Sequence, residues 1–109
     1  MRNDLLSIGE VANLKGVSVK ALRYYERVGV LRPAYVNPET GYRYYTMCQM
    51  GELDVIVSCV QLGVPLRELS GYVSDHGVMD VSALLDRARD LAAKKLRKTE
   101  AILMTLDEY

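Results

Sequence analysis

The chain has 109 residues, of which 50% are hydrophobic and 26% are charged, a composition typical of one folded domain and not of a disordered segment. Its 14 Lys and Arg residues balance 14 Asp and Glu residues, which excludes a strongly basic protein, but residues 1–50 hold seven bases and four acids and so carry a net charge of +3. No apolar run approaches the ~18 residues that indicate a membrane span, and no apolar leader opens the chain, so we expect a cytoplasmic protein with no membrane partner.

The first predicted helix begins after Ser7. Ser7 and Glu10 have the spacing of a capping box, in which each side chain bonds the backbone N–H of the other residue. Ile8, Val11, Ala12 and Leu14 then follow at helical intervals, and we expect Leu14 to lie in the core. Gly16 ends this helix, because glycine readily adopts a left-handed conformation.

A second helix is predicted from Val19 to Val28, directly after Ser18 as its N-cap. Leu22 and Tyr25 are expected to face the core. Two short helices joined by so tight a turn predict a helix-turn-helix.

Residues 31–45 change character and predict a β-hairpin. Two β-prone stretches, Tyr35–Val36 and Tyr42–Tyr45, flank a turn rich in Pro, Asn, Thr and Gly. A hairpin placed after a helix-turn-helix is a wing, which can reach the DNA backbone. In this wing Tyr42 and Arg43 are the expected phosphate contacts, and by strand alternation Tyr44 or Tyr45 is expected to pack inward, although the hairpin sequence leaves the opposite parity open.

Two further helices are predicted before residue 76. Thr46 and Gln49 have capping-box spacing, and a helix then runs to Gly63; Pro65 begins another helix, with Leu66, Leu69, Tyr72 and Val73 on one side. Cys48 and Cys59 lie about 16 Å apart along the first of these helices, too far for a mutual disulfide or a shared metal ion. We interpret both as small hydrophobic residues and expect no metal and no cofactor.

The last segment, residues 80–109, contains neither Pro nor Gly and predicts one long helix. Its apolar residues recur every three or four positions, the spacing of a coiled-coil seam. This stripe needs a partner, and a second copy of the chain is the simplest one, although folding back on the same chain or packing on another domain would also cover it. The expected dimer interface consists of Leu85, Ala92, Leu96, Thr99, Leu103 and Leu106, with Ala88 also on the seam.

These motifs together resemble those of the MerR family of transcriptional regulators. The resemblance is carried by the helix-turn-helix segments Ser7–Ala12 and Val17–Glu26, by Gly29–Pro33 and Tyr42–Tyr45 of the wing, and by Leu62–Leu66 between the middle helices. The wing looks most like that of the multidrug-sensing (BmrR-like) branch. The expected fold is mainly α: a winged helix-turn-helix DNA-binding domain over residues 1–75, a linker over 76–79 and a coiled-coil dimerisation helix over 80–109.

The second helix has the residues expected of a helix that reads the major groove. Ser18 places unpaired backbone N–H groups at its start, which favours a phosphate, and Lys20 and Arg23 share one face with Tyr24 beside them. Arg23 suits either a phosphate or a guanine edge, and the resemblance favours the phosphate. The expected DNA-binding residues are Ser18, Lys20, Arg23, Tyr24, Tyr42 and Arg43.

The resemblance also implies a mechanism and partners. Regulators of this type bind, as dimers, a pseudo-palindromic promoter spacer and distort it so that RNA polymerase can start transcription, a use of DNA deformability. Multidrug-sensing members carry an effector domain after the dimerisation helix, and this sequence ends where such a domain would begin. We therefore expect either a fragment of a longer protein, whose small-molecule effector binds a C-terminal domain absent from this chain, or a naturally short regulator.

Two other classes of function are alternatives to a DNA-binding regulator. An enzyme is disfavoured, because the sequence has no glycine-rich phosphate loop, nucleophile elbow or cluster of His and Cys; acids such as Glu26 are interpreted as helix-surface residues. The second alternative is a dimerising adaptor that keeps the winged fold without binding DNA, to which the zero net charge gives some weight.

Overall fold

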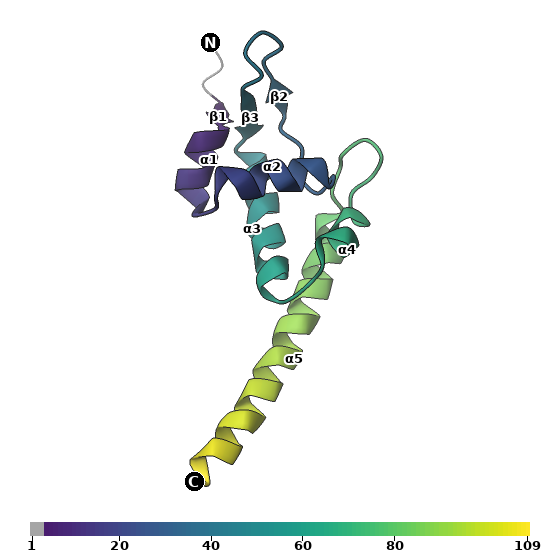
Figure 1. Ribbon diagram of the computed structural model, residues 1–109. Helices are drawn as coiled ribbons and strands as arrows, with labels where there is room; N and C mark the ends of the chain where they lie inside the picture. The colour runs from purple at the N-terminus through teal and green to yellow at the C-terminus, as the bar shows by residue number, and fades with distance from the viewer. Residues whose placement is uncertain (1–3) are drawn as a thin grey trace.

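The structure, a computed structural model, describes residues 4–109. A small globular part contains a sheet and four helices, and a fifth helix extends away from it, so that the molecule measures 63 × 28 × 21 Å (Figure 1). The elements in chain order are β1 (Leu5–Ser7), α1 (Ile8–Lys15), α2 (Val19–Arg27), β2 (Tyr35–Val36), β3 (Arg43–Thr46), α3 (Cys48–Gln61), α4 (Leu66–Ser70) and α5 (Val81–Asp107).

The predicted helix-turn-helix is present as α1 and α2, and the predicted caps define its ends. The Ser7 Oγ accepts from the Glu10 N–H at 3.1 Å, and Glu10 Oε1 accepts from the Ser7 N–H at 2.8 Å, which completes the capping box. Gly16 follows α1 with φ of 66°, in the left-handed region. The Ser18 Oγ accepts from the Ala21 N–H at 2.9 Å and caps α2.

The predicted wing is the hairpin of β2 and β3, and a third strand joins it. Tyr35 pairs with Tyr44, and Val36 pairs with Arg43. β1 pairs antiparallel with the other edge of β3, giving the strand order β1-β3-β2. Because β1 leads directly into α1, this extra strand fixes the wing to the start of the helix-turn-helix.

The middle of the chain differs from the prediction in one respect. The Thr46 and Gln49 bonds form as predicted, at 3.0 Å and 3.4 Å, and α3 runs to Gln61 with Gly63 following at φ of 89°. The helix after Pro65 is shorter than expected, because α4 ends at Ser70. Val73 instead forms an isolated antiparallel bridge with Met79, which closes the loop before α5.

The core is apolar and draws on nearly every element. Among the described residues no polar or charged residue is buried, and the largest fully buried side chains include Leu22 of α2, Tyr45 of β3, Leu53 and Ile56 of α3, Leu69 of α4 and Leu84 of α5. The start of α5 therefore belongs to the globular part, with Leu84 and Ala88 buried in its core.

The expectation that Leu14 lies in the core is wrong, since 57% of this residue is exposed. Ile8, Val11 and Ala12 form the inward face of α1. Leu14 follows Val11 by three positions, but it lies on the side of Val11 that faces away from Ile8 and Ala12. The expectations for Leu22 and Tyr25 are confirmed, because both are buried.

Candidate nucleic-acid interface

The outer face of α2 is cationic and exposed. Leu22 and Tyr25 anchor the helix in the core, which turns Lys20, Arg23 and Tyr24 to solvent. Arg27, one turn after Arg23, lies over the Tyr24 ring with its guanidinium carbon 5.3 Å from the ring centroid. Such cation–π stacking holds an arginine in place while leaving its charge uncovered.

Ser18 at the start of α2 is exposed, but its side chain is already engaged. Its Oγ accepts a hydrogen bond from the Ala21 N–H. An accepting hydroxyl still has its own O–H to donate. Ser18 therefore keeps one donor that can be directed outward.

Arg43 lies against α2. On β3, Arg43 and Tyr45 are two positions apart and so share one face of the strand. Arg43 Nε forms an ion pair with Glu26 Oε1 of α2, and Nη1 donates to the Gly41 carbonyl at 3.3 Å. The hydrogen bond and the charge of Glu26 raise the pKa of Arg43, so this side chain stays cationic.

The ion pair borders a hollow between α2 and the wing. Its volume is about 440 Å³, and its lining consists of Arg23, Glu26, Arg27 and Arg43. Three of the four lining side chains are cationic. A hollow of this chemistry suits an anion, because arginine N–H groups donate strong hydrogen bonds to phosphate oxygens.

The wing tip extends beyond this hollow. The Asn37 Oδ1 accepts from the backbone N–H groups of Glu39 and Thr40 at 2.9 Å and 3.3 Å, which orders the turn. Tyr42 then projects from the end of the hairpin and is 66% exposed. The inward residue of the expected pair is Tyr45, which is fully buried, while Tyr44 packs against Tyr35 with ring centroids 6.1 Å apart.

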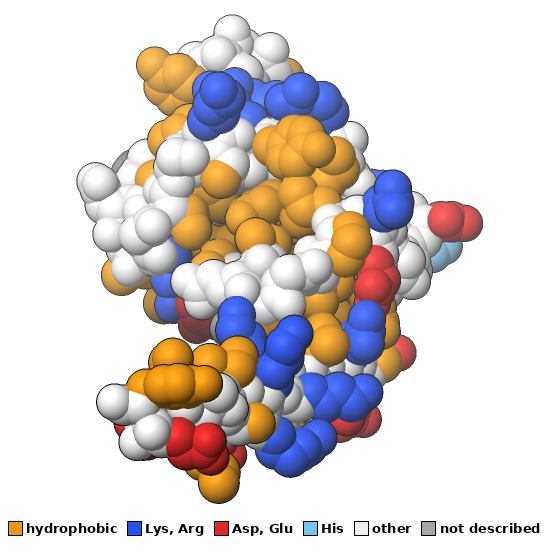
Figure 2. All heavy atoms as spheres, turned by 60° about the horizontal axis from the view of Figure 1, so that its bottom comes forward, with side chains coloured by type: hydrophobic (Ala, Val, Ile, Leu, Met, Phe, Trp, Pro, Cys, Tyr) orange, Lys and Arg blue, Asp and Glu red, His pale blue; other side chains and the backbone are white. Residues whose placement is uncertain are grey.

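The second surface without a visible partner is the outer part of α5. Here Ala92, Leu96, Thr99, Leu103 and Leu106 are all exposed. In Figure 2, where the bottom of Figure 1 comes forward, hydrophobic side chains gather in the middle of the face and again at the end of the long helix. Of the expected interface residues, only Leu85 is half-buried.

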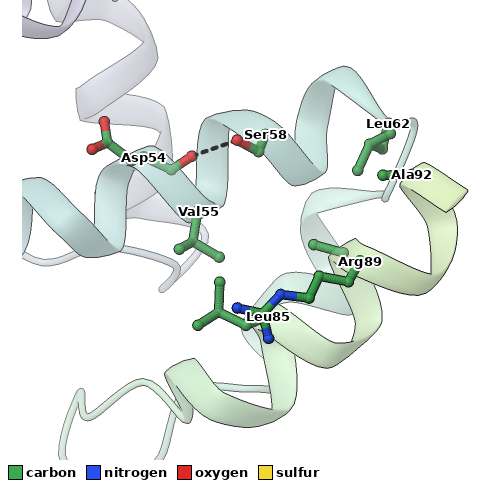
Figure 3. Close-up of a pocket in the computed structure, with 8 residues that line it drawn as sticks. Asp54, Val55, Ser58, Leu62, Leu85, Arg89 and Ala92 are labelled. Carbon is green, nitrogen blue, oxygen red and sulfur yellow. Dashed lines mark hydrogen bonds between the residues drawn. The ribbon is translucent and has the colours of Figure 1, made fainter.

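This stripe leads into an apolar groove between α3 and α5, with a volume of about 270 Å³. Val55 of α3 and Leu85 of α5 face each other across it, and Leu62 and Ala92 lie toward its other end (Figure 3). The remaining lining residues are Asp54, Ser58, Ala88 and Arg89. The groove and the stripe thus form one continuous apolar surface along α5.

Two residues that line the hollow were not among the expected DNA-binding residues. Glu26 was expected to be a helix-surface acid, and Arg27 was not among the expected DNA-binding residues. Both lie within one helical turn of Arg23, a spacing that places all three on neighbouring positions of one face. That spacing could have found them, whereas the contact between Glu26 and Arg43 depends on how the wing folds back.

The interpretation of both cysteines as small hydrophobic residues agrees with the burial of Cys59 but not with the exposure of Cys48. Cys59 is buried, and its burial raises the pKa of its thiol, while Cys48 is exposed at the start of α3. Within residues 4–109 no group of three or more His, Cys, Asp or Glu side chains is arranged to hold a metal ion. No helix in the same range is long and apolar enough to cross a membrane.

Comparison with protein families matches residues 6–75 to the MerR HTH family of regulatory proteins. The multidrug-efflux transporter 1 regulator of Bacillus subtilis is 51% identical over 69 residues, which are 63% of this chain and 25% of the relative. The chain spans about a quarter to two fifths of the length of the first curated relatives it matches.

Solved structures give the same result. The HTH-type transcriptional regulator SkgA of Caulobacter crescentus superposes with a TM-score of 0.75 and 29% identity over 95% of this chain and 73% of that one. A cryo-EM structure of an EcmrR–DNA complex in EcmrR-RPo gives a TM-score of 0.60 and 32% identity over 95% of this chain and 38% of that one.

Proposed function

The chain belongs to the MerR HTH family of regulatory proteins, and from this membership we propose that it is a DNA-binding transcriptional regulator that acts on promoter DNA as a homodimer. Residues 1–75 supply the DNA-binding domain, residues 76–79 a short linker and residues 80–109 the dimerisation helix. The role is regulatory and not catalytic, in keeping with relatives named as regulators. A chromosomal target implies a cytoplasmic location.

The observation that carries this proposal is the cationic hollow between α2 and the wing. Arg23, Arg27 and Arg43 converge there from two elements, although the whole chain has no net charge. Most protein–DNA hydrogen bonds go to the phosphates, and such contacts fix a reading helix in the groove. The hollow therefore supports a role for α2 as the helix that enters the major groove.

Within this arrangement the predicted DNA-binding residues divide by position. Lys20, Arg23 and Tyr24 project from the outer face of α2 toward the groove and its edges, and Ser18 offers its hydroxyl and the start of the helix to a phosphate. Tyr42, exposed at the end of the hairpin, and Arg43 of β3 would reach the DNA backbone from the wing. The EcmrR structure, which contains DNA, is a further support for this assignment.

Dimerisation is supported by the continuous apolar surface along α5. Its expected contact residues are Leu85, Ala92, Leu96, Thr99, Leu103 and Leu106, and all but Leu85 are exposed in one copy of the chain. A 27-residue helix spans about 40 Å, so two such helices side by side would hold the two DNA-binding parts at a fixed separation. Fixed separation sets the spacing of half-sites on the DNA.

The remaining parts of the proposal concern regulation. The dimer would distort the spacer of a promoter that RNA polymerase uses poorly, and the cost of that distortion would be offset by phosphate contacts from both halves. Because the first curated relatives are more than twice as long as this chain, a small-molecule effector domain following α5 is consistent with this scheme.

A mobility-shift titration on the DNA upstream of the chain's own gene tests the proposal. We expect salt-sensitive binding that weakens about tenfold or more in Arg23→Ala, because a hydrogen bond to a charged group contributes about 1.5–3 kcal/mol. Lys98→Ala, which removes an exposed cation from α5, serves as the matched control and should bind as the wild type does. Failure of the wild-type dimer to bind this duplex would favour the adaptor over the regulator.

A further inference from the structure

Glu26 presents a puzzle, because it places a carboxylate in the middle of the cationic hollow. It shares the lining with Arg23, Arg27 and Arg43, where a phosphate would have to approach. By charge alone this acid should weaken DNA binding, since like charges repel. Its position therefore calls for another explanation.

The contacts of Glu26 supply one. Its carboxylate binds Arg43 at Nε, and the Gly41 carbonyl accepts from Nη1. Within residues 4–109 no hydrogen bond reaches Nη2 of Arg43. The two contacts thus hold the guanidinium at Nε and at Nη1 and leave Nη2 available as a donor on a planar group that is already fixed in place.

The strand face that carries Arg43 of this pair also carries a core residue. Tyr45, on the same face of β3 as Arg43, is fully buried, and its hydroxyl has no hydrogen-bond partner among the described residues. Burial raises the pKa of Tyr45, to which the charge of Glu26 adds, while the charges of Arg43 and Arg23 act in the opposite direction. Arg43 therefore projects from a strand whose same face is anchored in the core by Tyr45.

We propose that Glu26 is a positioning residue: by binding Arg43 it holds the wing guanidinium beside Arg23, so that both arginines bind one phosphate of the DNA backbone. This inference rests on the proposed DNA binding. An unrestrained arginine loses side-chain freedom when it binds, and an arginine already held in place loses less. Glu26 and Arg43 are each only 27% exposed and act as an ion pair, so the charge of Arg43 offsets the repulsion that Glu26 exerts on a phosphate.

Two variants of Glu26 separate positioning from charge. Glu26→Ala and Glu26→Gln each remove one negative charge, but only Gln keeps an oxygen that can accept from Arg43. A pure charge effect predicts that both variants bind DNA more tightly and to the same extent. Positioning predicts that Glu26→Ala binds about two- to tenfold more weakly per protomer, with Glu26→Gln in between.

The binding assay uses a duplex selected by the wild-type chain from a randomised pool. Glu39→Gln is the matched control, because it removes an acid from the wing turn, where its backbone and not its side chain bonds Asn37; it should bind equally well or slightly more tightly. In an Arg43→Ala background, Glu26→Ala should cause no further loss. Thermal unfolding by circular dichroism verifies that each variant is folded. If Glu26→Ala does not fold, Glu26→Gln carries the test, because positioning predicts weaker binding than the wild type and a pure charge effect predicts tighter binding.

A scan of single methylphosphonate substitutions, which neutralise one phosphate at a time, identifies the phosphate itself. We expect one position per half-site to lose its sensitivity in Glu26→Ala and in Arg43→Ala, and the same position to be affected in Arg23→Ala. The inference is overturned if Glu26→Ala binds as tightly as Glu26→Gln, or if Arg23 and Arg43 map to different phosphates, while the wild type still binds. A wild-type chain that binds no duplex would overturn both this inference and the proposed function.

Discussion

Removal of Leu103 from the apolar stripe of α5 should weaken the homodimer. Leu103 is 56% exposed in one copy of the chain and lies on the face that also holds Leu96, Thr99 and Leu106. The substitution Leu103→Ala preserves the helix, because alanine has the highest helix propensity. Its effect should therefore be confined to what the side chain covers in the dimer.

The magnitude follows from the exposed fraction. Full burial of a leucine side chain contributes about 1.5–3 kcal/mol, so covering the exposed 56% of Leu103 contributes about 1–1.5 kcal/mol. A two-fold dimer loses this contribution twice, which gives about 2–3 kcal/mol. At about 1.4 kcal/mol for each factor of ten, the dissociation constant of the dimer should rise about 30- to 140-fold.

Met104→Ala is the matched control for this prediction. Met104 is the next residue, is 70% exposed and lies on the opposite side of α5 from Leu106 and Thr99. Sedimentation equilibrium over a range of concentrations measures the dissociation constant of the wild type and both variants. Equal effects of Leu103→Ala and Met104→Ala, or a wild type that stays monomeric at high concentration, would refute the assigned interface.

Three further predictions follow from the contacts described above. Arg43→Ala should weaken binding to specific and non-specific duplexes alike and reduce the slope of log K against log salt by roughly one per lost phosphate contact; a loss confined to one base position would contradict this. Leu53→Ala, at a fully buried site of α3, should lower the free energy of unfolding in urea by about 2–5 kcal/mol, whereas Val60→Ala on the exposed side of α3 should change it far less. Arg87 lowers the pKa of Glu68 through their hydrogen bonds. The pair therefore stabilises the fold above the unfolded-state pKa of about 4.3, and this stabilisation is lost as the pH falls through the lowered pKa of the folded state. Arg87→Met should show a smaller loss of melting temperature on acidification, and a pH profile identical to that of the wild type would refute the pairing.

The parts of the fold that the sequence predicted well are those set by local chemistry. The Ser7–Glu10 and Ser18 caps and the glycine after α1 act within a few residues, and they mark the helix ends in the chain itself. The wing turn is similar, because Asn37 orders it through its neighbours. The family resemblance, which rests on these motifs, is confirmed by the match over residues 6–75.

The parts that escaped prediction depend on distant contacts. β1 is only three residues long and exists because β3 offers an edge whose paired residues lie 37 to 41 positions later in the chain. α4 ends at Ser70 and Val73 bridges to Met79, a contact that the helical spacing of Tyr72 and Val73 does not indicate. The ion pair of Glu26 and Arg43 likewise joins residues 17 positions apart, so the cluster at the hollow follows from tertiary packing.

The start of α5 shows the same limit in another form. The sequence contains one broad apolar stripe along residues 84–106, which was assigned mainly to the dimer. The structure divides it: Leu84 and Ala88 are buried in the chain's own core, while Leu96, Leu103 and Leu106 stay exposed. The periodicity predicts the helix, but the position of α3 beside α5 decides which part of the stripe is buried within one chain.

A hydroxyl-radical footprint of the wild-type chain on its selected duplex tests most directly whether two copies bind one DNA through α2 and the wing. Two protected segments should lie on one face of the duplex, with centres separated by whole helical turns of about 10 base pairs, and both should fade together in Arg23→Ala. One protected segment, or two that respond independently to this substitution, would contradict the paired arrangement.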